Sequence, residues 1–214
     1  ASHQVLPEYR EYERFSATSV NAFVSPVMGA YLGHVKKSIP RKTRLRVMQS
    51  NGGSISAARA SEEAVQTILS GPAAGVVGAF EAGRAAGYER VITFDMGGTS
   101  TDVSLCDASI TTRTNSTISG VPVAVPVVDI HTVGAGGGSI AWLDSASSLH
   151  VGPQSAGARP GPVCYGTGSD LTVTDANLFL GRMLADRFLG GRRTLDLDRV
   201  QSHMLKFANH LGMS

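Results

Sequence analysis

The sequence predicts an α/β domain with a mixed sheet and flanking helices, because helical and extended patterns alternate along its 214 residues. The clearest helical pattern runs from Ala17 to Ser38, where apolar residues recur every three or four positions. The clearest extended pattern is the apolar run Arg90–Phe94, which is rich in β-branched and aromatic residues. A chain of this length is long enough to bury a sizeable core, as one domain or as two small ones.

Local signals place the remaining elements. Pro26 is expected to kink the first helix, since proline lacks an amide N–H and clashes with the preceding turn. Residues Ser61–Glu63 resemble a helix start, with acidic side chains in the first turn. Pro72 suits the first turn of a helix over residues 73–86, whose small side chains let either a neighbouring backbone or a ligand approach closely. Further helices are expected at 175–182 and 197–211, and extended segments at 45–49, 103–105, 121–127 and 139–143.

Glycine is the most informative part of the composition, at 25 of 214 residues; the usual share is roughly 7%. There is no Gly-X-Y period, which excludes collagen, and 42% hydrophobic residues exclude a disordered tail. The glycines therefore belong to a folded protein, where they mark tight turns or places where something approaches the backbone closely.

Charge, hydropathy and cysteine usage exclude several partners. A formal net charge of +2 is too small to indicate nucleic acid or an acidic membrane surface. The longest apolar stretch, Ile68–Phe80, is interrupted by serine, glycine and proline and is too short to span a bilayer. Cys106 and Cys164 lack metal-ligand spacing, which favours a reduced, cytoplasmic protein. The chain starts without an initiator Met or a signal-peptide pattern, so we expect a piece of a longer chain.

The strongest chemical feature is the segment Asp95–Asp102, DMGGTSTD, between two extended runs. Its two consecutive glycines, Gly97 and Gly98, allow a hairpin turn with positive φ at one or both positions. The backbone N–H groups of such a turn can converge on an anion such as a phosphate. Three hydroxyl groups follow as further donors: Thr99, Ser100 and Thr101.

The two aspartates that flank this turn suggest catalytic roles. Asp95 could hold Mg²⁺, which prefers carboxylate, water and phosphate oxygens. Asp102 could orient a water molecule or act as a general base. The alternative is a structural Gly-Gly hairpin with polar decoration, although a purely structural turn gives little reason for an aspartate on each side.

The setting of the turn excludes two common nucleotide motifs. A Walker A loop has a following Lys-Ser/Thr and a helix, and the Rossmann GxGxxG also opens a helix after its strand. Asp95–Asp102 is instead followed by another strand pattern. A turn between two strands is typical of the phosphate hairpin of actin-like ATPases.

A second glycine cluster spans Asp129–Ser139 and lies between apolar runs, which excludes a flexible linker. Its glycines Gly136, Gly137 and Gly138 could bind a nucleotide or a substrate through their backbone. Asp129 and His131 are spaced i, i+2, so on a strand they would share a face, an arrangement that would suit metal ligands or an acid/base pair. The alternative for His131 is a hydrogen-bonded core histidine.

A third cluster, Gly152–Gly166, carries three prolines among its glycines and predicts a rigid, irregular loop. Cys164 has no base beside it in the sequence, which favours packing over a nucleophilic role. Asp175, just beyond this cluster, could equally be a helix N-cap or a ligand.

Taken in order, these segments resemble the hydantoinase A/5-oxoprolinase family. The resemblance is carried by SNGGSIS at 50–56, ILSGPAAGVVGA at 68–79, TFDMGGTSTDVSL at 93–105, DIHTVGAGGGSIAW at 129–142, VGPQSAGARPGPVCYG at 151–166 and TVTDANLFLGR at 172–182. It implies a ribonuclease-H-like fold of the actin/sugar-kinase/heat-shock type, in which two halves enclose ATP. Residues 1–214 would then be the second half of that fold, because the family's first GGTFTD-type motif has no counterpart here besides Asp95–Asp102.

The same resemblance implies an ATP-dependent hydrolase of cyclic amides. ATP would phosphorylate the ring carbonyl oxygen before water opens the ring, with Mg²⁺ or another divalent metal as cofactor. The implied partners are a small cyclic amide, the missing N-terminal half of the subunit and a hydantoinase B-type subunit or domain, and the isolated fragment would be inactive. The alternatives are a subunit of an acetone-type carboxylase and a non-catalytic, actin-like nucleotide-binding module.

For the site residues, the resemblance supports phosphate binding by Gly97, Gly98 and Thr99 and metal binding by Asp95. It also implies nucleotide or substrate contacts from Gly136–Gly138. Asp129 and His131 remain candidate metal or substrate ligands.

Overall fold

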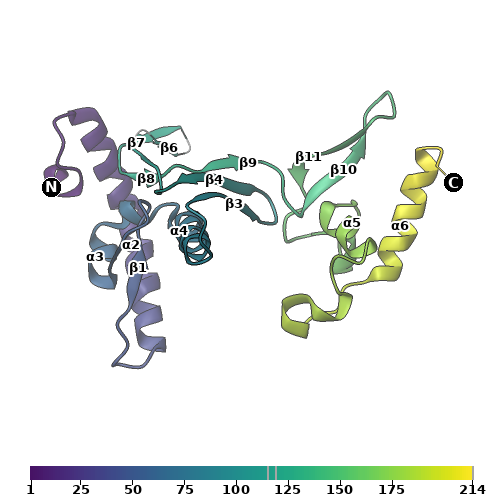
Figure 1. The fold of residues 1–214 in the computed structure, drawn as a ribbon, viewed down its shortest axis with the longest axis horizontal. Helices are drawn as coiled ribbons and strands as arrows, with labels where there is room; N and C mark the ends of the chain where they lie inside the picture. Colours follow the sequence, from purple (N-terminus) through teal and green to yellow (C-terminus); the bar gives the residue numbers. More distant parts are fainter. Residues whose placement is uncertain (115, 119, 214) are drawn as a thin grey trace. The chain divides into compact units, whose positions relative to one another are not determined.

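The computed structural model describes residues 1–114, 116–118 and 120–213, with helices toward both ends of the chain and a run of short strands between Arg90 and Ser155 (Figure 1). The chain divides into two compact units. Unit 1 comprises Ala1–Thr93 and Val103–His131, and unit 2 comprises Phe94–Asp102 and Thr132–Ser214. No helix in the described part of the chain is long and apolar enough to cross a membrane.

Unit 1 begins with the short helix α1 and the long helix α2, Glu11–Ser38, which confirms the helical pattern seen in the sequence. The helix starts before Ala17 because Glu11 and Glu13 place negative charge at its N-terminus, where the helix dipole favours it. Pro26 lies inside the helix without ending it. The helical elements of unit 1 are α1 (Ser2–Val5), α2, α3 (Ala57–Glu62), the 3₁₀ helix η1 (Ala64–Thr67) and α4 (Ser70–Ala85).

The prediction of a helix start at Ser61–Glu63 is wrong, because helix α3 ends there. Its N-cap is Ser56, whose hydroxyl accepts the N–H of Arg59 at 3.3 Å. The serine that satisfies a free amide of the first turn therefore lies five residues earlier in the chain.

Helix α4 uses its small side chains to pack closely against its neighbours in unit 1. A Cβ atom on Gly83 would lie 2.7 Å from Cγ2 of Val91. Three further residues of the helix, Ala73, Val76 and Phe80, are buried in one apolar cluster with Cys106 and Val128. Of the two interpretations of this helix, the contacts therefore support close packing.

The strands of the described chain form several small sheets. They are β1 (Arg46–Met48), β2 (Ser54–Ser56), β3 (Arg90–Met96), β4 (Thr101–Asp107), β5 (Thr112–Arg113), β6 (Ser116–Ile118), β7 (Val121–Val123), β8 (Val127–Val128), β9 (His131–Val133), β10 (Ser139–Leu143) and β11 (Leu149–Ser155). The pairs β1–β2, β5–β8, β6–β7 and β10–β11 are antiparallel, and a further sheet has the order β3-β4-β9. The α/β class is confirmed, but in place of the expected mixed sheet the described strands form several small sheets, in which these four pairs are antiparallel.

Unit 2 is built around helices α5 (Val173–Phe179) and α6 (Leu197–His210). The 3₁₀ helix η2 (Val163–Tyr165) precedes α5 in the chain, and the 3₁₀ helix η3 (Ala185–Gly191) lies between α5 and α6. Its apolar cluster includes Val163, Leu178 and Val200, all buried. Cys164 is buried in the same cluster, and burial is the main cause that raises the pKa of its thiol to about 12. The packing role predicted for Cys164 agrees with this position.

Asp175 is not the N-cap of helix α5. Thr172 is the N-cap, and Asp175 is the third helical residue, which completes a capping box with it. The Asp175 carboxylate is fully buried and accepts the N–H groups of Val163 and Cys164, at 3.1 and 2.8 Å. Its carboxylate thus joins the start of α5 to η2.

The third glycine cluster is less irregular than predicted. Its first part, through Ser155, belongs to strand β11, which pairs with β10. Pro153 is tolerated in this strand because β11 lies at the edge of a two-stranded sheet.

Candidate phosphate-binding hairpin

Residues Gly97–Ser100 form the turn between β3 and β4, as the sequence predicts. The turn is closed by the N–H of Gly97, which donates to the carbonyl oxygen of Ser100 at 2.8 Å. Neither Gly97 nor Gly98 has a positive φ, so the predicted reason for these glycines is wrong. Four residues separate the strands, and a loop of this length does not need the positive φ of a two-residue turn.

The second glycine cluster lies directly against this turn. Gly137 donates its N–H to the carbonyl oxygen of Gly97 at 2.9 Å, and Gly138 donates to that of Gly98 at 2.6 Å. A Cβ atom on Gly136 would lie 2.7 Å from the carbonyl carbon of Gly98, closer than real Cβ atoms approach. The two glycine clusters are therefore in direct backbone contact within unit 2.

The tip of the hairpin keeps unused hydrogen-bond donors. Among the described residues, the backbone N–H groups of Gly98, Thr99 and Ser100 have no acceptor. Gly98 and Thr99 are exposed. A Cβ atom on Gly98 would meet nothing within 4 Å, so protein packing does not explain its glycine. Consecutive free N–H groups on an exposed turn are what a bound anion requires.

The two aspartates of the motif differ in their surroundings. Asp95 is exposed, and its carboxylate has no hydrogen bond or ion pair to any residue that the structure describes. Asp102 is half-buried, and its Oδ1 accepts the hydroxyl of Thr132 at 2.6 Å. Sequence reasoning missed Thr132. The available signal was a hydroxyl residue inside the second glycine cluster, two positions before Gly134.

Several predicted ligand-binding groups are already engaged within the chain. Thr101 is buried, and its hydroxyl donates to the carbonyl oxygen of Ala135 at 2.5 Å. Gly136 and Gly138 are buried, and the N–H of Gly136 donates to Oγ of Ser139 at 2.9 Å. Ligand contact by these residues stays a prediction, and their N–H groups are not free to make it in this conformation.

Asp129 and His131 belong to unit 1, separately from Asp95 in unit 2. They do not share a strand, because β9 begins at His131 and Asp129 lies before it, so the argument for a common face is wrong. The Asp129 carboxylate forms an ion pair with Arg113, with Nη1 and Oδ1 3.3 Å apart. The described residues contain no group of three or more His, Cys, Asp or Glu side chains placed to hold a metal ion. The metal-binding roles stay predictions.

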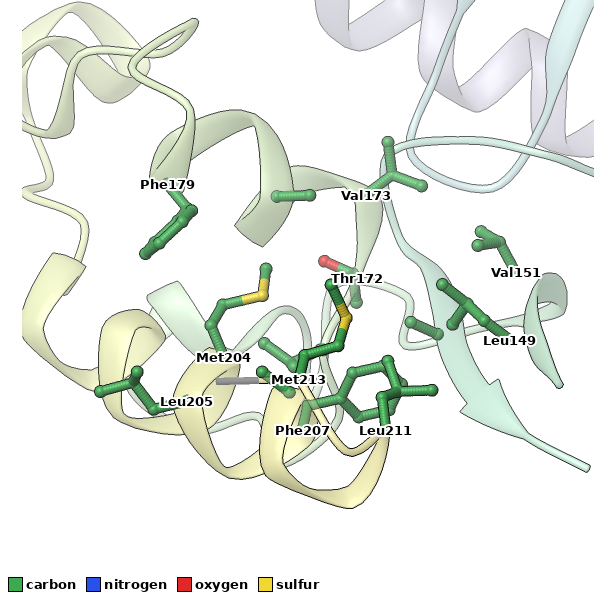
Figure 2. Close-up of a pocket in the computed structure, with 14 residues that line it drawn as sticks. Leu149, Val151, Thr172, Val173, Phe179, Met204, Leu205, Phe207, Leu211 and Met213 are labelled. Atoms are coloured by element: carbon green, nitrogen blue, oxygen red, sulfur yellow. The ribbon is translucent and has the colours of Figure 1, made fainter. Parts of the chain in front are cut away.

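Unit 2 also contains an apolar pocket of about 390 Å³, which includes none of the predicted site residues. Figure 2 shows Leu149 and Val151 of β11, Phe179 of α5, and Met204 and Phe207 of α6 among its lining side chains. A site that binds phosphate or an amide needs a few polar groups to orient the ligand. This lining supplies almost none, so the pocket is not the site of the predicted chemistry.

Fold and hairpin together define the class of the protein: an α/β domain whose candidate phosphate-binding turn joins two strands. Its sequence matches the family model described as Hydantoinase/oxoprolinase over residues 14–214. The chain therefore belongs to the hydantoinase/oxoprolinase family, which confirms the resemblance seen in the sequence.

Named relatives agree with this membership. The chain is 43% identical to caprolactamase subunit alpha of Pseudomonas jessenii, over 100% of this chain and 32% of that protein. It is 38% identical to the 5-oxoprolinase of Saccharomyces cerevisiae, over 96% of this chain and 16% of that protein. The chain thus spans a third or less of the length of these relatives.

Two solved structures share the fold. The nucleotide-free structure of acetone carboxylase, from work on ATP-dependent acetone carboxylation, superposes with a TM-score of 0.80 at 33% identity. The ATP-dependent caprolactamase of Pseudomonas jessenii superposes with a TM-score of 0.78 at 42% identity. Each alignment covers 100% of this chain, and 31% and 32% of the respective neighbour. The predicted fold, an α/β domain of the actin-like ATPase type, is confirmed by these matches to ATP-dependent enzymes.

Proposed function

We propose that this chain is part of an ATP-dependent hydrolase of cyclic amides, of the hydantoinase/5-oxoprolinase type. The observation that carries the proposal is the Asp95–Asp102 hairpin, whose tip has three backbone N–H groups without an acceptor among the described residues and thus able to bind phosphate. The named relatives support the reaction class, since caprolactam and 5-oxoproline are both cyclic amides.

The chemistry explains why such an enzyme uses ATP. Resonance makes an amide carbonyl a poor electrophile. Attack of its oxygen on the γ-phosphorus of ATP releases ADP and leaves an O-phosphorylated amide whose ring carbon water can attack. The ring C–N bond then breaks with protonation of the nitrogen, which leaves an acyl phosphate, and a second water hydrolyses this to the carboxylate and free phosphate. In this scheme the N–H groups of Gly98 and Thr99 offset phosphate charge, as in other phosphoryl transfers, and Asp102 orients the water or accepts its proton.

The residues present fit a divalent metal such as Mg²⁺ at the hairpin. Asp95 offers an exposed carboxylate without a partner among the described residues, which is the kind of ligand that Mg²⁺ combines with water and phosphate oxygens. When bound there, the metal would neutralise phosphate charge. We expect Asp95→Asn to weaken Mg²⁺-dependent nucleotide binding and to leave the melting temperature unchanged, because no described residue loses a contact. Calorimetry would measure this, and an unchanged affinity would remove Asp95 from the site.

The proposal includes partners. Residues 1–214 would act as the second half of the nucleotide fold, with the other half supplied by the rest of the same subunit and with a hydantoinase B-type subunit or domain alongside. Helix α2 supports this, because it exposes large apolar side chains at intervals of three, four and eight residues: Tyr12, Phe15, Phe23, Val27 and Tyr31. The isolated chain would then be inactive. We place the protein in the cytoplasm because both cysteines are free thiols.

One specific observation favours a second candidate, a subunit of an ATP-dependent acetone-type carboxylase. The superposition with acetone carboxylase has a TM-score of 0.80. In that reaction a carbon nucleophile would take the place of water. ATP hydrolysis that depends on bicarbonate would identify this alternative.

The decisive experiment uses the full-length subunit together with its partner. We expect ring opening of a cyclic amide, measured by chromatography, in step with release of ADP and phosphate. ATP turnover with bicarbonate and a ketone, and none with cyclic amides, would establish the second candidate. Absence of any ATP turnover with either substrate class would contradict both.

A further inference from the structure

The peptide planes of the hairpin suggest what the second glycine cluster does. Gly137 and Gly138 bind the carbonyl oxygens of Gly97 and Gly98. In a trans peptide the C=O and the N–H that follows it point in opposite directions, and neither hairpin peptide is cis. The N–H groups of Gly98 and Thr99 therefore both point away from the second glycine cluster.

We propose that Gly136–Gly138 is a positioning element: it fixes the direction of the Gly98 and Thr99 N–H groups and does not itself contact the nucleotide. This inference rests on the proposed function, in which those two N–H groups bind a phosphate of ATP. It differs from direct ligand binding by the cluster, because Gly136 and Gly138 are buried and their N–H groups already have acceptors.

The contact has no room for a side chain. A Cβ atom on Gly136 would lie 2.8 Å from the carbonyl oxygens of both Gly97 and Gly98, and one on Gly138 would lie 2.9 Å from that of Gly98. These neighbours are backbone atoms, which cannot rotate away as a flexible side chain can. Any side chain at Gly136 must displace the hairpin or the cluster, and either movement turns the peptide planes.

The positioning element is itself anchored to helix α5. The carbonyl oxygen of Gly137 accepts both the N–H and the hydroxyl of Thr174, at 2.7 and 2.8 Å. Thr174 lies in the first turn of α5, directly before the fully buried Asp175. The direction of the hairpin amides is thus tied to the packed part of unit 2.

Gly136→Ala tests the proposal in the full-length protein, with Gly134→Ala as the matched control. Gly134 lies two residues away, has no positive φ, and a Cβ atom there meets nothing within 4 Å. We expect Gly136→Ala to weaken MgATP binding at least tenfold by calorimetry and Gly134→Ala to change it less than twofold. In hydrogen exchange, the peptide that contains residues 97–100 should lose its MgATP-dependent protection only in Gly136→Ala. A loss of stability alone would not produce this result.

A second pair covers the case in which Gly136→Ala does not fold. Thr174→Val removes the hydroxyl that anchors Gly137 and keeps the shape, whereas Thr174→Ser keeps the hydroxyl. We expect about three- to tenfold weaker MgATP binding for valine, the effect of one neutral hydrogen bond, and recovery for serine.

The outcomes separate the two proposals. If the wild-type protein binds MgATP and folded Gly136→Ala binds it equally well, the positioning role is overturned and the ATP site stands. If Gly136→Ala does not fold but the two Thr174 variants do, equal MgATP affinity of Thr174→Val and the wild-type protein overturns the positioning role. If the wild-type protein binds no MgATP, the proposed function fails, and the inference fails with it.

Discussion

The hydroxyl of Thr132 donates a hydrogen bond to Oδ1 of Asp102 at 2.6 Å, across thirty residues of sequence. Asp102 stands at the start of β4, next to the turn, and Thr132 lies in β9. The bond fixes one carboxylate oxygen, while Oδ2 has no hydrogen bond to any residue that the structure describes, which suits a group that must present one oxygen to water.

Thr132→Val should therefore lower kcat of the full-length enzyme about three- to tenfold with little change in KM for ATP, because one hydrogen bond to a half-buried carboxylate is lost. Thr132→Ser keeps the donor and should restore the rate. Steady-state kinetics with the cyclic amide measure both. If valine and wild type have the same kcat, the orientation of Asp102 does not matter for the reaction.

The position of the hairpin was predictable from sequence, and its geometry was not. The residue types around Gly97 and Gly98 predict a strand, a turn and a second strand, and the structure contains all three. The close contact with the turn comes from Gly136, almost forty residues later, where a Cβ atom would lie 2.7 Å from the carbonyl carbon of Gly98. A local pattern carries no information about such an approach.

Other errors have the same origin. From the sequence Asp175 could equally be an N-cap or a ligand, but the capping hydroxyl is on Thr172 and the Asp175 carboxylate accepts the N–H of Cys164 in η2. Asp129 and His131 looked like neighbours on a strand, but the strand begins only at His131. Where residue type and local spacing decide the structure, as in α2 and α6, the predicted helices are confirmed.

Gly98→Ala separates binding from folding at the hairpin. A Cβ atom at this position meets no protein atom within 4 Å and φ is not positive, so the melting temperature should stay the same. A ligand that approaches the adjacent N–H groups would meet the new methyl group, and we expect at least tenfold weaker MgATP binding. Calorimetry and a thermal melt measure the two effects.

Gly78→Ala is the control for that experiment, since it lies in helix α4 and its Cβ position is also open. It should raise stability by about 0.5–1 kcal/mol, as alanine does in helices, without affecting MgATP binding. If Gly98→Ala also leaves affinity unchanged, no phosphate lies against Gly98.

Asp175 should be the most sensitive charged residue for folding. Its buried carboxylate accepts the N–H groups of Val163, Cys164 and Thr172, and the Thr172 hydroxyl, at 2.8–3.1 Å. Asp175→Ala leaves these donors buried without acceptors, which should cost about 3 kcal/mol or more in the free energy of unfolding. Urea denaturation measures the loss, and Asp107→Ala, at an exposed carboxylate, should change stability little. Equal effects of the two variants would contradict the structural role of Asp175.

The raised pKa of the Cys164 thiol predicts that stability falls at high pH. Burial, followed by the nearby Asp175 carboxylate, raises the pKa of its thiol from 9.0 to about 12. Between these values the unfolded chain loses the proton and the folded chain keeps it, so the contribution of Cys164 to stability is full below pH 9 and declines as the pH rises toward 12. Urea denaturation at pH 8 and pH 10 should show a decline in the stability of the wild-type protein that is smaller in Cys164→Ala.

The reactivity of Cys164 toward iodoacetamide is a separate test. At pH 8 this thiol should be alkylated only after the protein unfolds, because the thiolate is the nucleophile. Rapid alkylation of folded protein at this residue would show that the thiol is accessible and that its pKa is not raised.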